Sequence, residues 1–156
     1  MTVKRIEPST AGAGRRVGIV LSRFNPAIGE GLLQGALRAL RESGVREDDV
    51  TLVSVPGALE APLALQHLAQ TRRYDALVAL GAVIRGETYH FEIVANESAA
   101  GVSSVQLETG IPIGNGILTC ESDEQARVRM DAKGFEATLA ALELANLLAA
   151  LHAQAR

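Results

Sequence analysis

A short polar run with the means to do chemistry follows a buried apolar stretch near the middle of the chain. Residues 78–84 are apolar apart from Gly81, and they lead directly into a run that contains Arg85, Gly86, Glu87, Thr88 and His90. An apolar run followed by a turn and then helix formers is typical of a parallel strand that leads into its crossover helix. Free N–H groups at a helix start attract anions, and the arginine adds a cation. With an imidazole that titrates near neutral pH beside it, this turn predicts an enzyme.

Two other polar turns are expected at the same edge of the sheet. Residues 22–25 (Ser-Arg-Phe-Asn) follow an apolar run at 17–21, and residues 56–60 (Pro-Gly-Ala-Leu-Glu) follow another at 50–55. The carboxyl ends of parallel strands meet at one edge, where loops surround a crevice that binds ligands. The three turns are therefore predicted to line one site.

The elements that must position these turns alternate between strand and helix four times. Strands are expected at 17–21, 50–55, 76–81 and 112–118, and helices at about 26–43, 58–70, 89–107 and 121–156, the last broken or bent near Lys133 and Gly134. Pro26 and Pro62 suit first-turn positions of their helices. Such an alternation assembles as a right-handed, parallel, three-layer α/β domain. We expect a flexible N-terminal arm over residues 1–15 and a single domain over residues 16–156.

Composition narrows the class of protein. The chain of 156 residues supports one compact domain, and because aromatic residues make up only 3%, aliphatic side chains must fill its core. A net charge of −3 without a basic block argues against nucleic acid as a partner. No apolar run approaches the roughly 20 residues that cross a bilayer, so no membrane partner is expected. The single cysteine, Cys120, cannot form an intramolecular disulfide and fits a cytoplasmic location.

The ordered motifs of the chain resemble the 6,7-dimethyl-8-ribityllumazine synthase family. The resemblance runs through residues 22–25, 56–62 and 81–90, and continues through 96–98 (Asn-Glu-Ser), 116–119 (Gly-Ile-Leu-Thr) and 124–126 (Glu-Gln-Ala). It covers roughly residues 15–150 in unbroken order. The ordered set is far more specific than any single motif, and it is specific enough to indicate the enzymatic activity.

The resemblance implies a flavodoxin-like, three-layer α/β/α fold with a four-stranded parallel sheet. It implies an enzyme of riboflavin biosynthesis that condenses 5-amino-6-(ribitylamino)uracil with 3,4-dihydroxy-2-butanone 4-phosphate to 6,7-dimethyl-8-ribityllumazine and releases phosphate. The family uses neither a metal nor an organic cofactor. The expected partners are therefore the two small-molecule substrates and further copies of the chain, in a homopentamer or a multiple of it with each active site between neighbours.

The resemblance assigns one group of residues to the pyrimidine and its ribityl chain. Phe24 stacks on the pyrimidine ring; Ala58, Leu59 and Glu60 bind the ribityl chain; and main-chain groups of Ala82, Val83 and Ile84 hold the uracil edge. From the residue types alone, a core aromatic is the favoured interpretation of Phe24, because buried Phe is common. Glu60 is as readily a partner of a helix dipole.

A second group is assigned to the phosphate and to proton transfer. Gly86, Glu87 and Thr88 form the phosphate turn, His90 transfers protons, and Arg129 reaches the phosphate from the neighbouring subunit, with Lys133 near the bound substrates. Arg85 is equally suited to the phosphate or to a structural ion pair. Imidazole suits a reaction that moves several protons near neutral pH.

Two positions depart from the usual pattern of the family. Asn115 stands where many members have an aromatic that closes over the pyrimidine from the adjacent subunit, and an amide keeps hydrogen bonding but loses stacking worth about 1 kcal/mol. The segment from Arg129 to Gly134 is shorter than the corresponding segment of the family by about one helical turn. This difference affects the match of Lys133 to the lysine that lies near the substrates in the family.

Three alternatives remain open at this point. A flavin- or lumazine-binding storage shell would share the fold with little turnover. A related riboflavin synthase is less favoured, because both the turn at 24–25 and the run at 82–90 fit the lumazine-forming enzyme. A receiver or nucleotide binder would need an acidic cluster after the first strand or a glycine fingerprint, and the sequence has neither.

Overall fold

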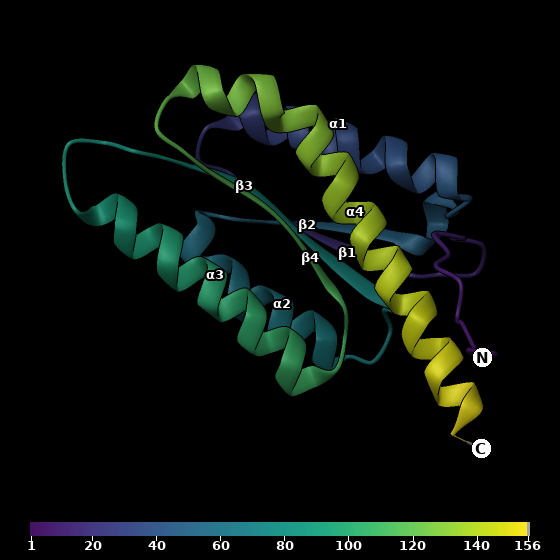
Figure 1. Cartoon of the computed structure of the whole chain (residues 1–156). Helices are drawn as coiled ribbons and strands as arrows, with labels where there is room; N and C mark the ends of the chain where they lie inside the picture. The colour runs from purple at the N-terminus through teal and green to yellow at the C-terminus, as the bar shows by residue number, and fades with distance from the viewer. Residues whose placement is uncertain (156) are drawn as a thin grey trace.

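Parallel strands in the order β2-β1-β3-β4 form the sheet, which lies at the centre of the molecule (Figure 1). In this computed structural model, which describes residues 1–155, the strands are β1 (Val17–Ser22), β2 (Val50–Val55), β3 (Ala76–Ile84) and β4 (Ile113–Cys120). The chain moves from β1 outward to β2 and then crosses back over β1 to β3. The strand order therefore reverses between β1 and β3, and the crevice beyond their carboxyl ends is where such sheets bind ligands.

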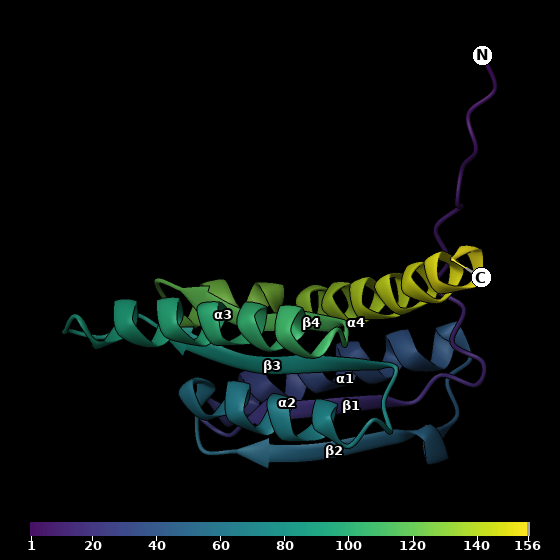
Figure 2. The same cartoon turned by 90° about the horizontal axis from the view of Figure 1, so that it is seen from below.

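Helices cover both faces of this sheet, as Figures 1 and 2 show. The helices α1 (Pro26–Ser43) and α4 (Asp123–Gln154) lie on one face, and α2 (Ala61–Gln70) and α3 (His90–Thr109) lie on the other. Residues of β3 alternate between the two cores: Val78 and Leu80 pack under α1 and α4, whereas Leu77 and Ala79 pack under α2 and α3. The predicted three-layer α/β/α architecture is confirmed.

The turn between β1 and α1 is shaped by two adjacent residues. Asn25 is the N-cap of α1 and has the left-handed conformation, with φ 55°. Pro26 opens the helix as predicted, because its fixed φ suits the first turn and its missing N–H would have no partner there. At the other end, Gly44 has φ 89° and stops the helix, a conformation that glycine adopts without steric cost.

Strands β3 and β4 are longer than the sequence predicted. β3 was expected to end at Gly81, but it continues to Ile84 because it pairs with β4 from Leu77 opposite Ile113 to Ile84 opposite Cys120. Gly114 and Gly116 lie within β4 and in its pairing with β3. Both face α4, and a Cβ on Gly114 would lie 2.1 Å from the carbonyl oxygen of Ala137, so they allow the helix to pack closely.

Several helix boundaries differ from expectation by one to three residues. A 3₁₀ turn, η2 (Ala58–Glu60), precedes α2, so the α-helix starts at Ala61 with Pro62 in its first turn. Tyr89 is the N-cap of α3, and not its first residue. A second 3₁₀ turn, η1 (Glu47–Asp49), precedes β2. Residue 156, the last of the predicted final helix and domain, lies outside the described residues.

Helix α4 is continuous, and it changes direction in its first half (Figure 1). A break near Lys133 is therefore wrong, and a bend at this residue stays a prediction. Here α4 lies almost in backbone contact with α1: a Cβ on Gly134 would lie 2.0 Å from the Leu32 carbonyl oxygen, and a Cβ on Gly35 would lie 2.2 Å from that of Asp131. Glycine at these two positions permits the helices to approach this closely.

Two findings concern the ends of the chain. By length and composition α4 would also suit a membrane span, with a third of its most apolar stretch buried, so the expectation that no segment could do so was too strong.

Gly12 donates its N–H to the Ser43 carbonyl at 2.7 Å, and the Asn146 amide donates to the carbonyls of Ser9 and Ala11. The first residues then lead away from the body of the protein (Figure 2); the division at residue 15 stays a prediction.

Candidate active site

A cavity of about 340 Å³ opens where β1, β2 and β3 end, at the reversal of strand order. We call it the strand-end cavity. It brings together residues that the sequence placed in three separate turns: Phe24 after β1, residues 58–60 after β2, and residues 82–84 with His90 around the end of β3. Phe24 is not a core aromatic, since 66% of its surface is exposed.

The aromatic ring and the carboxylate of this cavity converge above one glycine. A Cβ on Gly57 would lie 2.8 Å from the Phe24 ring and 3.5 Å from Oε1 of Glu60. The missing side chain therefore leaves the ring room to lie over the backbone. An exposed aromatic face beside a carboxylate suits a flat heterocycle that carries a hydroxylated chain.

The end of β3 presents unpaired backbone to the cavity. The pairing of β1 with β3 stops at Leu21 opposite Leu80, whereas β3 pairs with β4 up to Ile84. Over residues 82–84 the edge that faces β1 therefore has no strand partner among the described residues. The Asn25 side chain uses one group there, donating from Nδ2 to the Ala82 carbonyl at 3.2 Å. The remaining groups can read the edge of a ring through main-chain hydrogen bonds.

The predicted phosphate turn and His90 lie beside this cavity. Gly86, Glu87 and Thr88 are exposed, and they connect β3 to α3 without lining the cavity. Within residues 1–155 no side chain caps the N-terminus of α3. The hydrogen bond inside the turn, from the His90 N–H to Thr88 Oγ1, is long at 3.4 Å. The Glu92 N–H donates to the Tyr89 carbonyl at 3.0 Å, so the groups that can meet an anion are the N–H groups before it, in the turn and at the helix start.

Arg85 anchors the base of this turn through two carboxylates. Its Nη1 pairs with Glu92 in the first turn of α3, and its Nε donates to Glu121 Oε2 at 2.5 Å, just after β4. Its guanidinium carbon lies 4.4 Å from the centre of the Phe91 ring. The bonds to Glu92 and Glu121 raise the pKa of Arg85, and the bond from Arg85 lowers the pKa of the Glu92 carboxyl. Of the two roles open for Arg85, the structure shows the ion pair.

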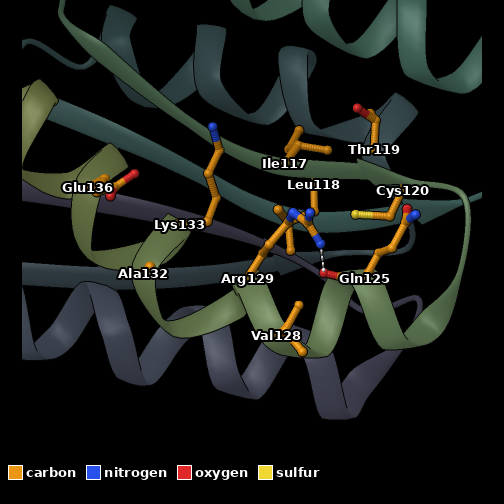
Figure 3. A pocket seen from close by; sticks show the side chains of 10 residues that line it. All are labelled: Ile117, Leu118, Thr119, Cys120, Gln125, Val128, Arg129, Ala132, Lys133 and Glu136. Carbon is orange, nitrogen blue, oxygen red and sulfur yellow. Dashed lines mark hydrogen bonds between the residues drawn. The ribbon is translucent and has the colours of Figure 1, made fainter.

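Arg129 and Lys133 line a second cavity, of about 550 Å³, between β4 and the first half of α4. We call it the edge cavity, because β4 is an edge strand. Figure 3 shows Lys133 extended from α4 toward the strands, while Arg129 turns back along its own helix. There Nη1 of Arg129 donates to the Gln125 carbonyl at 2.9 Å. Both cations come from one helical face, four residues apart.

The start of α4 is fixed by a local capping pattern. Ser122 is the N-cap, and its Oγ accepts the Gln125 N–H at 3.2 Å. The Gln125 side chain reaches back to accept the Glu121 N–H at 2.8 Å. This reciprocal arrangement is close to a capping box. It sets the position of Arg129, one turn further along.

One chain does not bring all the predicted site residues together. The strand-end and edge cavities have no lining residue in common, so His90 and Arg129 belong to different cavities. Asn115 lines neither: it is exposed on β4, where its Oδ1 accepts the Ile117 N–H at 3.0 Å. Both cavities are open to solvent on surfaces that also expose large apolar side chains, among them Ile93 and Val128.

Several lining residues were missed by sequence reasoning. Asn25, Gly57 and Val94 line the strand-end cavity, and Gln125 and Glu136 line the edge cavity. A signal existed for Asn25 and Gly57, because both lie inside the quoted turns. Val94 had none, since a valine one turn inside a helix is indistinguishable from core. Within residues 1–155, no three or more His, Cys, Asp or Glu side chains gather where they could hold a metal.

Comparison with known proteins adds a family to this geometry. The family model described as 6,7-dimethyl-8-ribityllumazine synthase matches residues 14–149. A protein of that name from Methylobacillus flagellatus is 58% identical over 146 residues, which cover 94% of this chain and 98% of that protein. The namesake from Nitrosospira multiformis is 58% identical, covering 93% and 91%. That from Paraburkholderia phymatum is 54% identical, covering 97% and 88%. The match spans both cavities.

Proposed function

Because the chain belongs to the 6,7-dimethyl-8-ribityllumazine synthase family, we propose that its reaction takes place in the strand-end cavity, completed by the edge cavity of a neighbouring copy. The reaction condenses 5-amino-6-(ribitylamino)uracil with 3,4-dihydroxy-2-butanone 4-phosphate, releases phosphate and forms 6,7-dimethyl-8-ribityllumazine. The enzyme is a transferase of riboflavin biosynthesis. The relatives are named as synthases, which favours catalysis over a storage shell.

The observation that carries the location of the site is the convergence of three strand ends on one cavity. The uracil edge binds the unpaired backbone of residues 82–84, its ring stacks on Phe24, and the ribityl hydroxyls bond to Glu60 and the backbone of η2. These groups are present together at the switch point of the sheet. The flat ring and its polar chain match an aromatic face beside a carboxylate.

The turn between β3 and α3, together with His90, binds the phosphate and transfers the protons. The N–H groups of residues 86–88 hold the phosphate at the helix start, with the Glu87 side chain turned away. His90 shuttles protons during imine formation, phosphate loss and ring closure. Orientation of two small reactants supplies several kcal/mol of the acceleration, since the attacking amine is already nucleophilic.

A neighbouring copy supplies the missing cation. Arg129 and Lys133 line the edge cavity of their own chain, which shares no residue with the strand-end cavity. If the edge cavity of one copy faces the strand-end cavity of the next, the contact is head-to-tail and generates a ring. The exposed apolar residues Phe24, Ile93 and Val128 would be covered in that contact. Five copies, or a multiple of five, is the assembly that the family resemblance implies.

The location that we propose is the cytoplasm. Cys120 is a free, buried thiol. A protein without a disulfide is suited to a reducing compartment. Separation of cell extracts, followed by detection of the chain in each fraction, tests this point.

A direct assay tests the reaction. The purified chain is mixed with both substrates, and the absorbance of the lumazine product is followed together with the release of phosphate. We expect one phosphate for each lumazine formed, and no product when either substrate is omitted. A sample that binds the lumazine tightly but forms none from the two precursors would point to the storage alternative.

A further inference from the structure

The base of the phosphate turn has an electrostatic arrangement that the proposed mechanism does not use. Arg85 joins three segments: the end of β3, the first turn of α3 through Glu92, and the residue after β4 through Glu121. Its own backbone N–H donates to the Cys120 carbonyl at 2.9 Å. The side chain is partly exposed, at 39%, and Phe91 covers one face of the guanidinium. We call this set of residues (Arg85, Phe91, Glu92 and Glu121) the clamp.

The clamp is not a free cation for phosphate. Two of the three guanidinium nitrogens already face carboxylates, and one positive charge stands against two negative ones. A group with this net negative charge attracts a phosphate dianion poorly. The arginine fork is instead suited to hold two carboxylates in a fixed relation, which a lysine cannot do.

The turn that the clamp closes has little else to hold it. Residues 86–89 connect Arg85 to His90, and all are exposed. Among residues 1–155, the α3 N-terminus has no side-chain cap, and the internal bond at Thr88 is long. Arg85 and Glu92 pin the two ends of this turn to each other. Oε2 of Glu92 is buried without a hydrogen-bond partner in the described chain, so loss of Arg85 would leave a carboxylate that must move to reach water.

We propose that Arg85 is a positioning residue for the reaction: by holding Glu92 and Glu121 it fixes the phosphate turn and His90 at the mouth of the strand-end cavity. The inference rests on the proposed function, because it assigns the turn to the phosphate-bearing substrate. The groups assigned to the other substrate, the ribitylaminouracil, are positioned by other elements. Phe24 and Glu60 follow β1 and β2, and residues 82–84 are held by β4.

The test compares steady-state kinetics of Arg85→Ala, Arg85→Lys and Glu92→Gln, with KM measured for each substrate separately. Arg85→Ala and Glu92→Gln should raise KM for the butanone phosphate and lower kcat, with a loss in kcat/KM on the order of tenfold to a hundredfold from misplacement of the turn. KM for the ribitylaminouracil should change by less than about twofold. Arg85→Lys should recover part of the loss, because it keeps one ion pair but not the fork.

Arg38 offers a matched control. It pairs with Asp131 at 2.7 Å and with Glu42, lies 4.2 Å from the centre of the Phe135 ring, and is as exposed as Arg85, at 40%. It joins α1 to α4 and has no part in the turn. Arg38→Ala should lower the melting temperature about as much as Arg85→Ala and leave both KM values and kcat unchanged.

Each contrary result has a distinct meaning. Wild-type kinetics for Glu92→Gln beside an impaired Arg85→Ala would overturn the inference and make Arg85 a direct phosphate ligand. Equal loss for both substrates, or the same kinetic loss in Arg38→Ala, would reduce the clamp to general stabilisation. An inactive wild-type chain would contradict the proposed function. An active wild-type chain whose clamp variants keep wild-type kinetics would contradict only this inference. If Arg85→Ala does not fold, Glu92→Gln still decides.

Discussion

At the residue scale, the proposed chemistry depends on two side chains, His90 and Arg129, which line different cavities of the chain. His90 lies at the first turn of a helix that starts beside the strand-end cavity. Arg129 lies in the edge cavity, where it bonds to a carbonyl of its own helix. An imidazole that shuttles protons can be replaced in part by water. A cation that fixes a phosphate has no such substitute.

Loss of Arg129 should therefore cost more than loss of His90. We expect His90→Ala to lower kcat by about tenfold to a hundredfold, at the low end of general acid–base effects. Arg129→Ala should cost more, a few hundredfold, as for removal of a charge-stabilising donor. Initial rates of lumazine formation under saturating substrates measure both. A wild-type rate for Arg129→Ala would refute its assignment.

At the element scale, the long helix α4 places the edge cavity, and its position depends on contacts without side chains. Gly134 lies over the Leu32 carbonyl of α1, and Gly114 of β4 lies under the Ala137 carbonyl of α4. Backbone cannot yield as a flexible side chain can. The approach of α4 to α1 and β4 is thus set by glycine, and Arg129 and Lys133 are carried with the helix.

Substitution of Gly134 by alanine should destabilise the fold. A Cβ there would lie 2.0 Å from a backbone oxygen, and relief of this overlap should cost about 2–3 kcal/mol of unfolding free energy. Denaturant titration at a fixed protein concentration measures the change. Gly86→Ala is the control, because a Cβ at Gly86 meets nothing within 4 Å, and its stability should stay within about 0.5 kcal/mol. Equal stability of the two variants would contradict the packing argument.

The clamp between β3 and α3 predicts a dependence of stability on pH. The bond from Arg85 holds the pKa of Glu92 below its ordinary value of 4.5. A carboxyl whose pKa is depressed by folding stabilises the native state above its unfolded pKa, and this contribution is lost as pH falls through the folded pKa.

Glu92→Gln should therefore melt below the wild type at pH 7, and the gap should narrow as the pH falls below 4.5. Melting curves of both proteins, recorded from pH 7 downward at one ionic strength, measure the gap. A gap that is constant over this range would mean that the ionised carboxylate is not what stabilises the turn.

At the scale of the whole molecule, a single chain presents two cavities that have no lining residue in common. The edge cavity lies beside edge strand β4 and the strand-end cavity lies at the switch point between β1 and β3. A surface that joins one cavity to the other cavity of the next copy is heterologous, and its repetition gives a ring where the rotation between copies closes. Light scattering should give a mass of five, or a multiple of five, copies of the 16.4 kDa chain.

Mixed assemblies of two impaired variants test whether the site is shared. If His90 comes from one copy and Arg129 from its neighbour, random co-assembly of His90→Ala and Arg129→Ala chains leaves about a quarter of the sites intact. The rate of the mixture should exceed that of either variant alone. Each variant assembled separately, and then mixed without exchange, is the control. A co-assembly no faster than this control would place both residues in one chain.

The sequence by itself determined the order of the elements and the three turns that meet at the strand-end cavity. Apolar periodicity and Pro26, Gly44 and Pro62 specify local structure, and a parallel alternation leaves one edge for the turns to share. Because these signals are local, they can be recognised in a single amino-acid sequence. Most of the predicted pyrimidine-site residues, such as Phe24 and Glu60, therefore fall in one cavity.

Only the tertiary structure decided features that depend on contacts between distant segments. Pairing with β4 extends β3 to Ile84, and packing against α1 accommodates Gly134 inside a continuous helix. The choice between ion pair and phosphate ligand for Arg85 required Glu121, which lies 36 residues further along the chain. Such contacts carry no local signal, because the same residue types fit a solvated surface equally well.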